Sequence, residues 1–200
     1  MNKNKNITSY FDQKAKKYYD KSVSFPWSII RNIEANVVKK FIGNIKNRIV
    51  FDVGCGSGYY SKLLIEFKAK KVFALDGSVE MLNNLNDKNI IKINQDAEKI
   101  KIKKKFDKII CTGLLEFVKS PEKVLKNIKK SAKKNCDFVI LCPSDNFLAK
   151  IYKIYHSRNN INIKLFSFYE INNILKKTGW KVKKRKKVIF SNIILAKPIL

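Results

Sequence analysis

The sequence is poor in the residues that mark several large classes of protein. Its 200 residues include seven glycines and four prolines, too few for a collagen-like or low-complexity chain. Its longest apolar runs, 138–142 and 193–196, are far shorter than the roughly 18 residues that a membrane-spanning helix needs. Residues 1–19 are polar and lack the apolar stretch of a secretory signal peptide. With 45% hydrophobic residues to bury, we expect a soluble protein of the cytoplasm.

Cysteine and histidine are also scarce. The single histidine is His156, and the cysteines, none in a CxxC pair, are Cys55, Cys111, Cys136 and Cys142. Zinc sites take three or four such ligands at short spacings, so we expect no metal site. Three of the cysteines lie in or beside apolar runs, where a free thiol packs as a small hydrophobic group. Reduced thiols agree with a cytoplasmic location.

Acidic residues are outnumbered, with 16 against 43 basic residues and a net charge of +27. Such an excess is typical of proteins that bind nucleic acid or an anionic membrane. Only four of the basic residues are arginine, however, and arginine is the side chain best suited to bidentate phosphate and base contacts. Lysine, asparagine and isoleucine are the residues that A/T-rich codons favour. We therefore favour the interpretation that the excess lysines form a solvated surface. The alternative is that they bind nucleic acid or an anionic membrane.

What the sequence does contain is an alternation of helical and strand patterns. Apolar residues at helical spacing predict helices over 27–43, 60–67, 78–87, 121–132 and 167–177, the fourth after an N-cap at Ser120. Short β-rich runs predict strands over 48–53, 71–75, 90–93, 106–111 and 136–142. This alternation is typical of a doubly wound α/β fold with a mostly parallel sheet. Two more runs, 180–188 and 191–197, have no helix between them and predict an antiparallel hairpin at the sheet edge.

The first 45 residues precede the first predicted strand. We expect residues 1–45 to form a helical lid and residues 46–200 to form one α/β domain. No internal repeat or long linker interrupts the second segment.

The most informative stretch is a glycine-rich loop directly after the first predicted strand. Residues 50–60 read VFDVGCGSGYY, and the glycines let the backbone turn sharply and approach a ligand closely. Dinucleotide-binding folds share such loops, but here Gly58 follows Gly56 by two residues where their GxGxxG pattern needs three. Asp52, just before the loop, would repel a pyrophosphate and attract a cationic group. The implied ligand is a nucleoside that carries a cation and no phosphate.

Two more acidic residues end the next two predicted strands. Asp76 lies about 20 residues beyond the loop, where a carboxylate can accept both hydrogen bonds of a ribose diol. Asp96 follows the third strand, where an adenine amine could donate to it. Each aspartate alone could be a turn or N-cap residue. Because the carboxyl ends of parallel strands lie together, the acids and the glycine loop together favour one adenosine site.

With these residues the chain resembles the class I S-adenosylmethionine-dependent methyltransferases, from about residue 45 to 197. Residues 50–60 are similar to that family's first motif, 74–78 to its second-strand acid and 94–97 to its adenine-contacting segment. Residues 106–118 are similar to the stretch that flanks the transferred methyl group. The resemblance implies a Rossmann-like seven-stranded sheet with the last strand inserted antiparallel. It also implies S-adenosylmethionine as the cofactor.

The resemblance also implies which residues bind the cofactor. The amides of Gly54 and Gly56 should hold its methionine portion. Tyr18 either shields the sulfonium by a cation–π contact or fastens the lid to the sheet. Arg31 either pairs with the cofactor carboxylate or forms a salt bridge with Glu34. The full set of expected cofactor-binding residues is Tyr18, Arg31, Asp52, Gly54, Cys55, Gly56, Gly58, Asp76, Gly77, Asp96, Ala97 and Cys111.

The favoured function is methyl transfer to a small organic acceptor by in-line displacement at the sulfonium. Small-molecule relatives of the quinone-biosynthesis type often carry a histidine after the fourth strand, but this chain has Phe117 there, beside Glu116. Glu116 and His156 are therefore the candidate catalytic residues, and a structural role is the alternative for His156.

Two other functions stay open at this point. The positive charge and the lysine-rich run 181–187 favour an RNA methyltransferase. Two observations argue against it. Residues 111–114 read CTGL, where an enzyme that methylates the amine of a base has an Asp/Asn-Pro-Pro-aromatic box. We also expect no appended RNA-binding domain. The other alternative is a non-catalytic cofactor-binding protein whose crevice is blocked by residues 147–155. Lysine-rich helix faces could also dock on an anionic bilayer.

Overall fold

A computed structural model describes residues 3–199, and these residues contain one seven-stranded sheet in the order β3-β2-β1-β4-β5-β7-β6. Strands β1 to β5 pair in parallel, and β7 is antiparallel to both of its neighbours. The predicted fold class and the antiparallel hairpin are confirmed. The strands are β1 Ile49–Val53, β2 Lys71–Asp76, β3 Ile90–Asn94, β4 Phe106–Thr112, β5 Ala132–Pro143, β6 Trp180–Val188 and β7 Ser191–Pro198.

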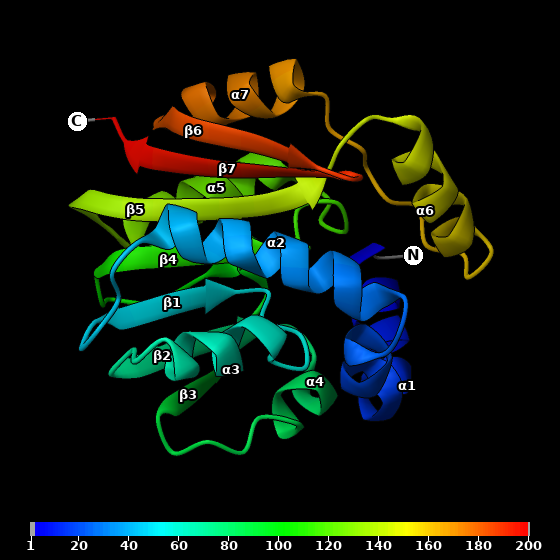
Figure 1. Cartoon of the computed structure of the whole chain (residues 1–200), viewed down its shortest axis with the longest axis horizontal. Coiled ribbons are helices and arrows are strands. Elements are labelled where there is room, and N and C mark those ends of the chain that lie inside the picture. Colours follow the sequence, from blue (N-terminus) through cyan, green and yellow to red (C-terminus); the bar gives the residue numbers. More distant parts are fainter. Residues whose placement is uncertain (1–2, 200) are drawn as a thin grey trace.

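Helices cover both faces of the sheet (Figure 1). Helices α2 and α3 bury their apolar residues against one face, and α5 and α7 bury theirs against the other. Side chains alternate along each strand, so on β1 Val50 enters the first layer and Phe51 the second. The helices are α1 Lys3–Val23, α2 Trp27–Ile42, α3 Tyr59–Glu66, α4 Val79–Asn83, α5 Pro121–Lys130, α6 Phe147–Ser157 and α7 Phe168–Lys177.

Two helices differ from the sequence-based prediction. The helix expected over 78–87 ends at Asn83, and Asn84 uses its side-chain amide to donate to the carbonyl of Ala15 at 3.1 Å. Helix α6 was not predicted as a helix. It begins at the N-cap Asn146, whose side chain accepts a 2.8 Å bond from the amide of Ala149. Its exposed apolar residues recur at helical spacing, a signal that was present in the sequence but was not used.

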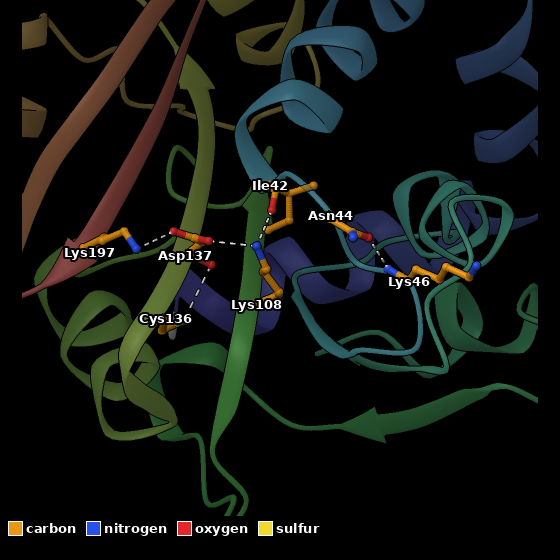
Figure 2. Close-up of polar contacts among 7 residues, drawn as sticks. All are labelled: Ile42, Asn44, Lys46, Lys108, Cys136, Asp137 and Lys197. Carbon is orange, nitrogen blue, oxygen red and sulfur yellow. Dashed lines mark hydrogen bonds and ion pairs between the residues drawn. The ribbon is translucent and has the colours of Figure 1, made fainter.

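A lysine inside the sheet fixes the end of α2 (Figure 2). The Lys108 ammonium donates to the carbonyl of Ile42 at 2.6 Å and pairs with Asp137 at 2.8 Å. Lys197 reaches the other oxygen of Asp137 at 3.1 Å. Burial opposes ionisation of Asp137, but the hydrogen bonds from both lysines outweigh it and lower its pKa. Helix α2 is thereby held to β4 and β5, which positions the residues at its other end.

The N-terminal helix α1 lies at the carboxyl ends of the strands, and its role as a lid stays a prediction. The Ser78 hydroxyl donates to the carboxylate of Asp12 on α1 at 2.5 Å. The ring of Phe11 packs edge-on against Phe117, with centroids 5.1 Å apart. No helix within residues 3–199 combines the length and apolar content needed to cross a bilayer.

Candidate active site

A cavity of about 540 Å³ opens at the carboxyl ends of the parallel strands. Its floor is built by the loop after β1, the ends of β2 and β3, and the segment after β4, while α1 and the start of α2 cover it. The chain leaves β1 toward β2 on one side and returns to β4 on the other, so the cavity sits at the topological switch point of the sheet. Its volume is within the range of about 300–1,000 Å³ that is typical of small-molecule sites.

Most of the expected site residues lie around this cavity. Those that line it are Tyr18, Arg31, Gly54, Cys55, Gly56, Asp76, Gly77, Asp96, Ala97 and Glu116. Those that do not are Asp52, Gly58, Cys111 and His156. Each of these four has a structural reason for its position.

Asp52 was expected to face a cationic ligand, but its side chain turns under the glycine loop. It is fully buried on β1, on the α3 side of the sheet, and accepts a 2.6 Å hydrogen bond from the Ser61 hydroxyl. Burial raises its pKa to about 7, against the lowering effect of the Ser61 bond. The period of two along the strand puts Asp52 on the same face as Val50, a consequence of the predicted strand that the sequence-based interpretation did not apply.

Cys111 and His156 also lie away from the cavity. Cys111 is fully buried in the core of β4, where desolvation raises the pKa of its thiol. His156 lies on the inner side of α6 within a cluster of rings and reaches the cavity only through Tyr152 and Phe117, which line it. His156 therefore does not line the cavity, and its catalytic role stays a prediction.

The glycine loop closes on the end of β2. The amide of Gly54 donates to the Leu75 carbonyl at 2.8 Å, and the amide of Gly56 donates to the Asp76 carboxylate at 2.8 Å. Both amides therefore bond to β2 in this structure, and their contact with the methionine portion of a ligand stays a prediction. A Cβ added at Gly56 would meet no atom within 4 Å. Gly56 thus leaves open space beside the cavity, room that a bound molecule can fill.

Gly58 has a packing role that makes a testable prediction. Its φ is +86°, and an added Cβ would lie 1.8 Å from a side-chain carbon of the buried Leu85. We expect Gly58→Ala to lower the free energy of unfolding by about 2–4 kcal/mol, from left-handed strain plus overpacking. Gly56→Ala, with open space around it, should cost only about 1 kcal/mol. Urea denaturation compares the two variants, and equal losses would contradict this assignment.

The acids at the ends of β2 and β3 face the cavity. The carboxylate of Asp76 accepts from the amides of Gly56 at 2.8 Å and Ser78 at 2.9 Å, and burial raises its pKa against these bonds. Asp96 caps the short 3-10 helix at 97–99 by accepting from the amide of Glu98 at 2.8 Å. Asp76 therefore has a local turn role and Asp96 a capping role, as their alternative had it, and both still border the cavity.

A polar cluster lies beside the aromatic end of the cavity. Glu116 is 3% exposed, and one of its carboxyl oxygens has no hydrogen-bond partner among the described residues. Burial raises its pKa to about 8, and the nearby Glu34 adds to the rise. Arg31 stands over the Tyr59 ring at 5.5 Å and forms no ion pair within 4 Å in the described part of the chain. The proposed salt bridge between Arg31 and Glu34 is therefore absent from these residues.

Some site residues were missed by the sequence-based reasoning. Glu34 is buried and accepts a 2.6 Å hydrogen bond from the Ser191 hydroxyl, and both line the cavity. The sequence did contain a signal for Glu34. It is a charged residue four positions from Ile30 and from Val38, and so lies on the apolar face of the helix predicted over 27–43. Other missed lining residues include five aromatic ones, Trp27, Tyr59, Tyr60, Tyr152 and Phe190.

The charge of the cavity is opposite to the charge of the chain. Arg31 is the only cationic side chain among the described residues that line it, while Glu34, Asp76, Asp96 and Glu116 contribute carboxyl groups. The carboxyl groups that are ionised repel phosphate and suit a ligand that carries positive charge. A sulfonium-bearing nucleoside therefore fits the cavity better than a dinucleotide.

Helix α6 does not close the cavity. Of residues 147–155, which the non-catalytic alternative requires as a plug, only Tyr152 belongs to the cavity wall. Phe147 and Ile151 point outward instead and are more than half exposed. The occlusion that this alternative needs is not found.

Comparison with known proteins identifies the family. The family described as "Methyltransferase domain" matches residues 29–184. Over 142 residues the chain is 32% identical to the tRNA U34 carboxymethyltransferase of Campylobacter fetus subsp. fetus, a match that covers 64% of this chain and 49% of that protein. The chain spans about half or less of the length of the curated relatives it matches.

Solved structures share the whole fold at low sequence identity. A chain in the Haloferax volcanii complex between the Trm112 methyltransferase activator and a methyltransferase has a TM-score of 0.79 at 16% identity, over 95% of this chain and 98% of that one. The magnesium protoporphyrin IX methyltransferase of Synechocystis PCC 6803, with bound SAH, has a TM-score of 0.76 at 17% identity, over 98% of this chain and 100% of that one. Because the family match covers most of the sequence, the chain belongs to the class I S-adenosylmethionine-dependent methyltransferases.

Proposed function

We propose that the chain transfers the methyl group to a small organic acceptor bound at the aromatic end of the cavity. The observation that carries this proposal is the buried carboxyl of Glu116, which lines the cavity with an oxygen that has no partner among the described residues. It lies among the rings of Phe11, Phe117 and Tyr152, which also line the cavity. An aromatic wall with one ionisable group is typical of a pocket for a largely apolar molecule with one polar atom.

The other end of the cavity suits the cofactor. Asp76 would accept the hydroxyls of its ribose, and Asp96 and Ala97 would border its adenine. Gly56 would leave room for it, and Arg31 would pair with its carboxylate. S-adenosylmethionine, when bound, supplies a methyl group that is already activated on a sulfonium. The chain must then align the acceptor and exclude water, for which α1 forms the cover.

Glu116 would act as the base for an acceptor that arrives protonated. A base works best when its pKa is near the operating pH, and burial raises the pKa of Glu116 to about 8. Glu116 in its ionised form would take the proton from the acceptor as the nucleophile forms its new bond. Arg31 and Glu34 lie close enough to influence that charge.

An RNA acceptor is the second candidate, and specific observations favour it. The curated relatives named above act, by their names, on U34 of tRNA. Strand β6 carries a strip of exposed basic residues, which ends near Phe190 and Ser191 of the cavity wall. The residues of the strip are Lys181, Lys183, Lys184, Arg185, Lys186 and Lys187. A polyanion could follow such a strip by electrostatic attraction.

Label transfer distinguishes the two acceptors. The enzyme is incubated with methyl-labelled S-adenosylmethionine and a cell extract that has been separated into tRNA, protein and small-molecule fractions. We expect the label in the small-molecule fraction, and much less with Glu116→Gln. Glu122→Gln, an exposed glutamate on α5, is the matched control and should transfer label like the wild type. Label confined to tRNA would overturn the proposal in favour of the RNA acceptor.

A further inference from the structure

Helix α6 carries a stripe of exposed apolar side chains. Its residues and exposed fractions are Phe147 76%, Leu148 48%, Ile151 51%, Ile154 55% and Tyr155 41%. They recur at positions i, i+1, i+4, i+7 and i+8, so they share one continuous arc of about 120° on the helix. The opposite side packs against the protein through Ala149, Tyr152 and His156. The helix is therefore apolar on the side that faces away from the core.

Other exposed apolar residues lie at the same end of the molecule. The side chain of Asn146 donates to the carbonyl of Ile189 at 2.8 Å, which brings the β6–β7 turn and its 39% exposed Ile189 to the start of α6. Phe25 and Ile29, both more than half exposed, lie at the start of α2. Helix α6 and the start of α2 occupy the same end of the molecule, toward which β1 and β5 point (Figure 1). Large apolar patches of this kind on a single protein mark interaction sites.

Positive charge borders the stripe. Lys150 is exposed at one edge of the arc, Lys153 is exposed farther around the helix on the same side, and Arg158 lies at the end of the helix. Asp145 is the only acidic residue between positions 143 and 165. A helix with an apolar face beside a lysine-bearing face is the pattern of helices that lie flat in the interface of an anionic bilayer.

We propose that α6 docks the protein on an anionic lipid bilayer. The five apolar residues of the stripe enter the headgroup boundary, while Lys150 and Lys153 remain level with the lipid phosphates. Tyr152, on the inner side of the same helix, lines the cavity, so docking brings the cavity wall next to the lipid surface. This inference concerns binding alone and does not depend on which acceptor is methylated.

Vesicle flotation tests the proposal with the full chain. We expect wild-type protein to float with phosphatidylcholine vesicles that contain phosphatidylglycerol, and the double variant Ile151→Ser/Ile154→Ser to bind about 10-fold more weakly or worse. Tyr169→Ser, which removes a 75% exposed ring on α7, is the matched control and should bind like the wild type. Because the substituted side chains are exposed, unfolding midpoints should not change.

Two charge variants distinguish attraction of the bilayer to the lysines of α6 from attraction to the net charge of the whole protein. Lys150→Glu/Lys153→Glu should weaken flotation more than Lys176→Glu/Lys177→Glu, which makes the same change of net charge at the end of α7. If both charge pairs weaken binding equally and the isoleucine variant binds like the wild type, net charge alone attracts the protein and the proposal is wrong. A stable dimer in sedimentation equilibrium that the isoleucine variant dissociates would also overturn it, because a second copy would then cover the stripe.

Discussion

Replacing Asp76 with alanine is expected to weaken S-adenosylmethionine binding by about 100-fold. The carboxylate supports the glycine loop through the amide of Gly56 at 2.8 Å and supports α4 through the amide of Ser78 at 2.9 Å. In our proposal it also accepts the ribose hydroxyls. Hydrogen bonds to a charged group contribute about 1.5–3 kcal/mol each, so losing those to the ribose amounts to about 3 kcal/mol, or a factor of about 100. Isothermal titration calorimetry measures the change directly.

The control for this substitution is an aspartate that lies far from the cavity. Asp107 forms a surface ion pair with Lys133 at 2.8 Å, near the start of β4. Exposed pairs contribute little, so Asp107→Ala should leave the dissociation constant of S-adenosylmethionine unchanged. Asp76→Asn keeps one acceptor oxygen, so its dissociation constant for S-adenosylmethionine should lie between those of Asp76→Ala and the wild type. If Asp76→Ala binds as tightly as Asp107→Ala, the ribose does not contact Asp76.

Glu116→Gln is expected to lower kcat by about 100-fold, because a positioned general base contributes at least that much. The dissociation constant of S-adenosylmethionine should stay close to that of the wild type, since the amide keeps the shape of the side chain. Steady-state kinetics with the acceptor found by label transfer provides kcat, and calorimetry provides the dissociation constant. A variant with unchanged kcat would remove Glu116 from the reaction and leave alignment as the main contribution of the chain.

The pH profile adds an independent measurement on the same residue. Burial raises the pKa of Glu116 to about 8 in the free protein, and the base is active only when ionised, so kcat/KM should rise with pH through about 8 and then level off. Glu116→Gln should lose this rise. The free energy of unfolding should change in the opposite direction. Glu116 holds its proton more tightly in the folded state than in the unfolded state, so its contribution to stability falls as pH rises from about 4.5 toward 8. The glutamine variant should therefore unfold at higher urea concentrations than the wild type above pH 8.

Local signals were sufficient to predict the sheet and the loop at its centre. The run before Gly54 is β-rich and stops at glycines, and Ser120 before a proline marks the start of α5, where its side chain accepts from the amide of Lys123 at 3.3 Å. Such features depend on neighbours in the sequence. The cavity position follows from them, because parallel strands end at one edge of the sheet.

The direction of each side chain depended on contacts between distant segments. Asp52 bonds to Ser61 across the layer below the loop, and Glu34 bonds to Ser191, 157 positions away in the sequence. No local pattern encodes either partner. Helix α6 is a different case: its apolar residues recur at helical spacing, so the sequence indicated a helix but not that its apolar side faces outward. The ring cluster around His156 likewise depends on α1, which lies far away in sequence.

Calorimetry on the unmodified protein tests most directly whether the cavity is built for a cationic nucleoside. The carboxyl groups that line it, with Arg31 as the only cation among the described lining residues, predict saturable binding of one S-adenosylmethionine per chain. NAD, whose pyrophosphate would meet those carboxyl groups, should bind at least 100-fold more weakly. Tight binding of NAD with no heat from S-adenosylmethionine would contradict the assignment of this cavity.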